Sequence, residues 1–111
     1  MPRCRSTLVL ALLLSSSCIS PTSLTRASES VLRNNLFTLR TAIDEYTFDK
    51  QQPPQSLQDL VDAGYLRELP LDPVTRSTET WRQLMKGSPG IVDISSGSDA
   101  RSLEGTVYSE W

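Results

Sequence analysis

The chain has 111 residues, of which 38% are hydrophobic, a size that fits one domain with a small core. Its 11 basic and 13 acidic residues give a net charge of −2, which argues against a nucleic-acid groove, because such grooves are basic. The sequence holds no histidine, which excludes Ser-His-Asp and Cys-His catalysis, and we expect a protein that is not an enzyme.

The N-terminal segment, residues 1–20, has the layout of an export signal. Basic residues precede an apolar run at positions 7–14, and small residues and Cys18 follow it, an order typical of secretory signals. The run is shorter than the about 20 residues that a membrane-spanning helix needs. Two interpretations stay open, namely cleavage near the serines and lipidation of Cys18 as in a lipoprotein. In both we expect the body, residues 21–111, to be exported.

A break is expected at residues 20–23, followed by a long helix over residues 24–52. Apolar side chains recur there at spacings of three and four, which is typical of one face of a helix. Neither glycine nor proline interrupts the pattern before Pro53 and Pro54 end it. We expect this stripe to be the core and assembly face of the helix; its members are Leu32, Leu36, Leu39, Ile43 and Tyr46.

Charged residues occupy the other faces of this helix. Glu29 and Arg33, and likewise Arg40 and Asp44, stand four positions apart and are expected to form pairs. A helix of about 26 residues is about 39 Å long, which is long for so small a domain. We therefore expect its N-terminal part to meet a membrane, a partner helix or solvent.

The remaining sequence predicts a compact half. A second helix is expected over residues 56–64, with Ser56 as its N-cap, Asp59 in its first turn and Gly64 at its end. Residues 69–73 are expected to be extended because of their prolines. Three strands are expected at residues 80–85, 90–95 and 105–109, separated by turn-forming sequences. The order predicts an α+β fold, with a long N-terminal helix packed on a small three-stranded antiparallel sheet.

Three stretches of the body carry a family pattern. Residues 39–46 have the sequence Leu-Arg-Thr-Ala-Ile-Asp-Glu-Tyr, residues 64–73 contain Gly-Tyr-Leu and Pro-Leu-Asp-Pro, and residues 93–99 read Asp-Ile-Ser-Ser-Gly-Ser-Asp. In order and spacing they resemble the type II secretion pseudopilins of the G, or major, class, over roughly residues 27–111. The family's Gly-Phe-Thr-Leu-x-Glu sequence does not occur in residues 1–20. We interpret that segment as signal-like, lipoprotein-like or a truncated anchor.

This resemblance implies a pilin-like fold and a function without catalysis, that of a structural subunit of a type II secretion pseudopilus. It implies a periplasmic location, association with the inner membrane, and other pseudopilins and components of the secretion machine as partners. A membrane contact through the N-terminus is a further expectation, and neither nucleic acid nor a small-molecule substrate is expected. The alternative is an exported lipoprotein or binding module that docks a partner on the pilin head. We expect the 111-residue chain not to polymerise alone.

The resemblance also implies a calcium ion in the C-terminal loop. Pseudopilins of this class hold one with carboxylates and backbone carbonyls, the oxygen ligands that Ca²⁺ prefers. Asp99 matches the aspartate of the family's turn, and Glu104 is the acidic residue that remains downstream. The open alternative is that Asp99 is a turn residue and Glu104 a solvated charge. No other cofactor is expected.

Overall fold

The computed structural model describes residues 21–87 and 89–111, so residues 1–20, where the sequence predicts an export signal and Cys18 lies, are outside the described residues. Its longest element is helix α2 (Pro21–Lys50), with 30 residues and a length of about 45 Å. Residues 21–23 are helical, and the break expected there is wrong. Proline has a φ value compatible with a helix and lacks only an N–H donor. The helix ends where Gln51 takes a positive φ of 58°.

Helix α3 (Leu57–Asp62) is bounded as the sequence predicts. Ser56 is its N-cap and forms a capping box with Asp59: the Asp59 N–H donates to Ser56 Oγ, and the Ser56 N–H donates to Asp59 Oδ2. Gly64 follows with a φ of +86°, the left-handed conformation that ends many helices. Tyr65 then donates a 2.6 Å hydrogen bond to Asp49 near the end of α2, which raises the pKa of Tyr65 to about 12.

The sheet has two strands, β1 (Arg82–Leu84) and β2 (Asp93–Ser95), which pair antiparallel with Gln83 opposite Ile94. The third strand expected at residues 105–109 is wrong. That segment makes one isolated bridge, between Arg101 and Val107, and continues into the 3₁₀ helix η1 (Tyr108–Glu110). The reason is local, because the N–H groups of this segment bond to residues just before it: those of Gly105 and Thr106 bond to Ser102, and that of Tyr108 bonds to Ala100 O.

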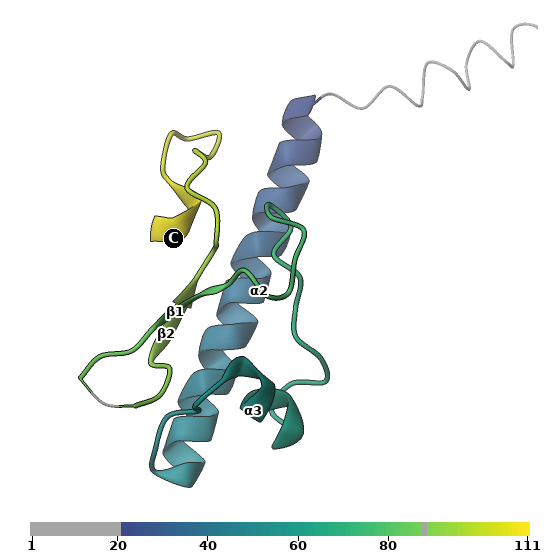
Figure 1. Cartoon of the computed structure of the whole chain (residues 1–111). Coiled ribbons are helices and arrows are strands. Elements are labelled where there is room, and N and C mark those ends of the chain that lie inside the picture. The colour runs from purple at the N-terminus through teal and green to yellow at the C-terminus, as the bar shows by residue number, and fades with distance from the viewer. Residues whose placement is uncertain (1–20, 88) are drawn as a thin grey trace, which may run out of the picture.

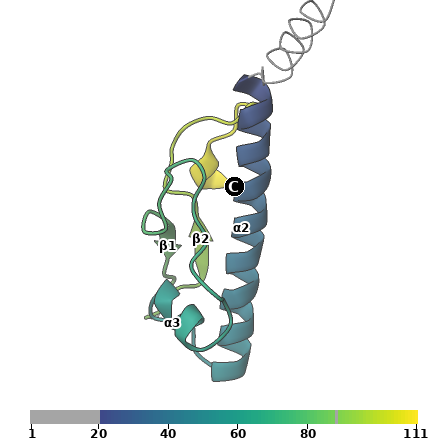
Figure 2. The same cartoon turned by 90° about the vertical axis from the view of Figure 1, so that its right-hand side faces the viewer.

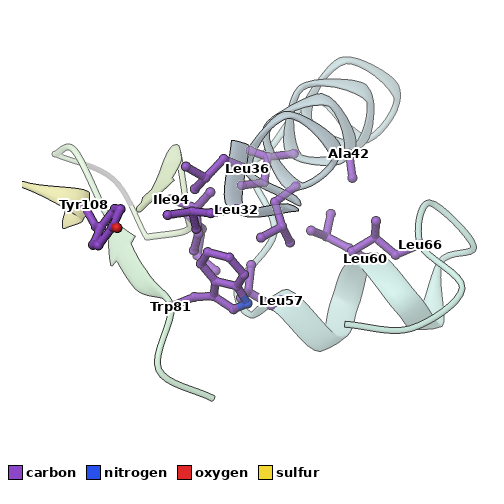
Figure 3. Close-up of a cluster of buried hydrophobic side chains, with 12 residues drawn as sticks. Leu32, Leu36, Ala42, Leu57, Leu60, Leu66, Trp81, Ile94 and Tyr108 are labelled. Carbon is purple, nitrogen blue, oxygen red and sulfur yellow. The ribbon is translucent and has the colours of Figure 1, made fainter. Parts of the chain in front are cut away.

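The core lies between α2, α3 and the sheet (Figure 3). The predicted stripe of α2 is confirmed as core: Leu32, Leu36, Leu39 and Ile43 are at most 2% exposed, and Tyr46 is half-buried and packs against them. The indole ring of Trp81 lies close to Leu57, and its N–H donates to Pro70 O at 2.9 Å. The other buried apolar members are Ala42, Leu60, Leu66, Ile91, Ile94 and Tyr108.

Everything after α2, which we call the head (residues 51–111), packs along one side of the helix. Figure 2 shows this directly: α2 stands at the edge of the molecule, and α3, the sheet and the C-terminal residues all lie on the same side of it. Figure 1 shows α3 near the C-terminal end of α2 and η1 nearer its N-terminal end. The other side of the helix is therefore left uncovered by the described part of the chain.

Candidate functional site

The two motif segments of the head meet at a buried carboxylate. Asp72, in the Pro-Leu-Asp-Pro segment, has no solvent exposure. Its Oδ1 accepts from the N–H groups of Val74 and Thr75, at 2.9 and 3.4 Å. Its Oδ2 accepts from Ser96 Oγ at 2.7 Å and from the Gly97 N–H at 3.1 Å. Asp72 thus joins its own turn to the turn that follows β2, which we call the 96–99 turn.

The 96–99 turn requires glycine at position 97, because there is no space for a Cβ atom there. A Cβ at Gly97 would collide with the backbone carbonyl oxygen of Thr80. Since that oxygen belongs to the main chain, it cannot rotate away as the end of a side chain could. The close approach also places the Gly97 N–H on the Asp72 carboxylate.

We expect Gly97→Ala to destabilise the fold by about 1–3 kcal/mol, as added methyl groups in packed sites do. The physical reason is that the turn must move off Thr80 and weaken its bond to Asp72. Urea unfolding followed by circular dichroism measures the loss. Glu79→Ala, at an exposed neighbour of Thr80, is the control and should change stability by less than about 0.5 kcal/mol. Equal midpoints for the two variants would contradict the steric argument.

Asp99, the first predicted calcium ligand, is occupied by protein groups. Its Oδ2 accepts from Arg82 Nη2 at 2.9 Å, and its Oδ1 accepts from Ser109 Oγ at 2.8 Å. These two hydrogen bonds hold the pKa of Asp99 below its ordinary value. A guanidinium beside the carboxylate opposes a second cation at the same place.

Glu104, the second predicted ligand, lies elsewhere. It is exposed and lines the space beside α2 together with Arg33. Residues 21–87 and 89–111 contain no group of three or more acidic, cysteine or histidine side chains placed to hold a metal. With Asp99 held by Arg82 and Glu104 exposed elsewhere, the residues present do not fit the calcium site that the resemblance implies.

A groove of about 600 Å³ runs between α2 and the C-terminal segment, residues 100–111. Arg33 stacks on the Trp111 ring, with its guanidinium carbon 4.4 Å from the ring centroid, a favourable cation–π geometry. Tyr108 packs edge-on against the same ring. The groove offers aromatic and guanidinium surfaces, which suit the binding of a polypeptide. Its lining residues are Arg33, Leu36, Phe37, Arg40, Glu104, Thr106, Glu110 and Trp111.

The charged pairs predicted along α2 are wrong. Arg40 donates to Asp93 Oδ1 at 3.0 Å and to the carbonyls of Ile94 and Trp111, so it serves the sheet and the C-terminal segment and not Asp44. Glu29 accepts from the Leu103 N–H at 2.8 Å and from the Tyr108 hydroxyl at 3.0 Å. Burial and this bond to Glu29 raise the pKa of Tyr108.

Three residues that hold the head together carried little signal in the sequence. Asp72 stands between prolines in a recognisable motif, which indicates a turn but not burial. Arg40 and Glu29 look like ordinary solvated helix charges, because their partners are more than 50 positions away in the chain. Only the spatial arrangement of α2 and the C-terminal segment reveals their contacts.

Comparisons with known protein families, with characterised proteins and with solved structures found no match to this chain. Within the described residues, no helix combines the length and the apolar character needed to cross a bilayer.

Proposed function

We propose that this chain is a non-enzymatic structural subunit of a type II secretion pseudopilus, or a derivative of one, exported to the periplasm and associated with the inner membrane. The observation that carries the proposal is the one-sided packing of α2 (Figure 2). A helical filament requires subunits whose long helices keep one face free for their neighbours, and a 30-residue helix with its head on a single side has this form.

Exposed apolar side chains lie on the helix outside the core stripe. Phe37 is 70% exposed and also borders the groove beside Trp111, and Phe48 is 78% exposed. The two side chains lie about three turns apart on the same helix face. Leu24, near the N-terminal end of α2, is 56% exposed and lies on a different face of the helix. Large apolar side chains that stay in water on one face of an element often mark a contact surface. This open face supports a role in subunit contacts.

The apolar stripe of α2 was expected to serve as both core and assembly face, but it is buried against the head. Leu32 and Leu36 are covered within the subunit, so they cannot also pair with a second helix without unfolding the head. We propose that assembly uses the open face and needs the other pseudopilins and the secretion machine, and that the isolated chain stays monomeric. Light scattering at micromolar concentration should give the monomer mass, and filaments would contradict this part of the proposal.

The function itself is tested in the native host. Deleting the gene should block secretion, so that enzymes normally found outside the cell remain inside it. The wild-type gene should restore their secretion. Phe48→Asp should lower the restored secretion by about tenfold, because a buried charge at a contact centre costs more than about 1.4 kcal/mol. The matched control is Leu84→Asp on β1, where the side chain is 49% exposed.

Circular dichroism of both variants checks that each still folds, which we expect because both side chains are exposed. Normal secretion in the deletion strain would overturn the proposed function. If the deletion strain shows a secretion defect and the Phe48→Asp variant restores normal secretion, the proposed function is supported, but the open face is not the contact surface.

The second candidate is an exported lipoprotein or binding module that docks a partner on its head. The groove beside Trp111 favours it, since aromatic and arginine side chains are enriched at protein–protein interfaces. Metabolic labelling with palmitate distinguishes the two functions. Labelling that disappears in Cys18→Ser, in a strain with normal secretion, would favour the binding module.

A further inference from the structure

Three separate segments of the head meet at Asp99. Arg82 comes from β1, Asp99 from the end of the 96–99 turn, and Ser109 from η1. One carboxylate oxygen binds the guanidinium and the other binds the hydroxyl, at 2.9 and 2.8 Å. Asp99 therefore links the sheet, the turn and the C-terminal segment with its two oxygens.

Arg82 also reaches a backbone oxygen of the same turn. Its Nη2 donates to Gly97 O at 3.4 Å as well as to Asp99 Oδ2. A carboxylate oxygen and a main-chain carbonyl of one turn are the kinds of oxygen that a calcium ion takes as ligands. Here a guanidinium, which is always protonated and donates in fixed directions, faces them. The pairing of Arg82 with Ser95 across the sheet sets its position.

The contact matters for the C-terminal segment because Ser109 lies between two residues that dock on α2. Tyr108 is buried and its hydroxyl donates to Glu29, and the ring of Trp111 stacks under Arg33 further along the helix. The Tyr108 N–H also bonds to Ala100 O at 3.0 Å, directly after Asp99. The contacts that hold Asp99 in place therefore also hold the C-terminal segment, which packs on α2.

We propose that Arg82 is the internal cation of the 96–99 turn, standing where the resemblance implies calcium, and that through Asp99 and Ser109 it holds the C-terminal segment on α2 without a metal ion. This proposal is independent of the proposed function, because it uses only contacts within the chain, between segments of the head and between the head and α2. The Arg82 and Asp99 side chains are 49% and 70% exposed, so the effect is modest in size and weakened by salt.

The first test is a calcium titration of the full ¹⁵N-labelled chain, followed by the backbone amide signals of residues 96–105. Up to about 5 mM calcium chloride, above the dissociation constants of most extracellular calcium modules, we expect no saturable change beyond that caused by magnesium chloride. A saturable calcium response with a dissociation constant below about 1 mM, absent in Asp99→Asn, would overturn the proposal.

The second test measures whether Arg82, through Asp99, holds the C-terminal segment in place. Arg82→Gln and Asp99→Asn should each speed hydrogen exchange at the Ala100 and Tyr108 amides by about threefold, the size expected for a part-exposed ion pair. The double variant should exchange no faster than the faster single variant, because both remove the same contact.

The control is Arg67→Gln, which removes the same charge at an exposed position of the head and should leave these two amides unchanged. Amides in the middle of α2 should be unaffected in every variant. The proposal is wrong, even when calcium does not bind, if the Ala100 and Tyr108 amides exchange at the same rate in Arg82→Gln as in Arg67→Gln. It is also wrong if the effects of Arg82→Gln and Asp99→Asn on these exchange rates add fully.

Discussion

Asp72→Ala is expected to destabilise the fold by about 3–5 kcal/mol, a large part of the about 5–15 kcal/mol that stabilises a typical domain. The carboxylate accepts four hydrogen bonds and has no solvent exposure. Removing it leaves the Ser96 hydroxyl and three backbone N–H groups without an acceptor in a place that water cannot readily enter. Each such group costs about 1–3 kcal/mol when it stays unpaired, and partial rearrangement recovers some of the total.

Urea unfolding followed by the fluorescence of the tryptophans measures this loss, since Trp81 bonds to Pro70 beside the same turn. Asp72→Asn retains one acceptor oxygen and should lose about half as much. Asp62→Ala is the control, because Asp62 is exposed on α3 and, within residues 21–87 and 89–111, its side chain accepts a single hydrogen bond, from Gln58. A loss for Asp72→Ala within about 1 kcal/mol of that for Asp62→Ala would show that the buried network is not needed for stability.

Leu39→Ala is the second change with a large expected effect, about 2–4 kcal/mol. Leu39 has no exposed surface and lies in the middle of the stripe that meets α3 and the sheet. Truncation removes its apolar contacts and leaves a cavity that the surrounding helix and sheet can fill only in part. In a domain with so small a core, few other contacts compensate.

The matched control is Phe48→Ala, a larger truncation on the same helix at a side chain that is 78% exposed. It should change the free energy of unfolding by less than about 0.5 kcal/mol. Chemical denaturation of the wild type and both variants under one set of conditions gives the comparison. If both variants unfold at the same urea concentration, the stripe does not carry the stability assigned to it.

The sequence by itself determined the parts of this protein that depend on near neighbours in the chain. The spacing of Leu32, Leu36, Leu39 and Ile43 identified the buried face of α2, because helical geometry alone brings residues three and four apart to one side. Ser56, Asp59 and Gly64 marked the ends of α3, because a capping box and a left-handed stop act within a few residues.

The conformation of residues 105–109 depends on whether their backbone groups bond to a neighbouring strand or to residues nearby in the chain. The composition allowed a strand, but a strand needs a partner edge, and among the described residues the segment pairs at the single Arg101–Val107 bridge. The following N–H groups then bond within η1. Sequence patterns describe the preference of a segment but not the presence of a neighbour, and for this reason the third strand was predicted wrongly.

Only the tertiary structure decided the polar contacts that shape the candidate site. Arg40 had a carboxylate four positions away in Asp44, yet it pairs with Asp93 across 53 positions. Asp99 was expected to bind calcium or to act as a turn residue, yet it binds Arg82 and Ser109. Asp72 is the centre of a buried network because the 96–99 turn packs against it. Ionic and hydrogen-bonding groups bind whichever partner lies within about 3 Å. That distance is set by the packing of α2 against the head and of the segments of the head against one another, which no local pattern contains.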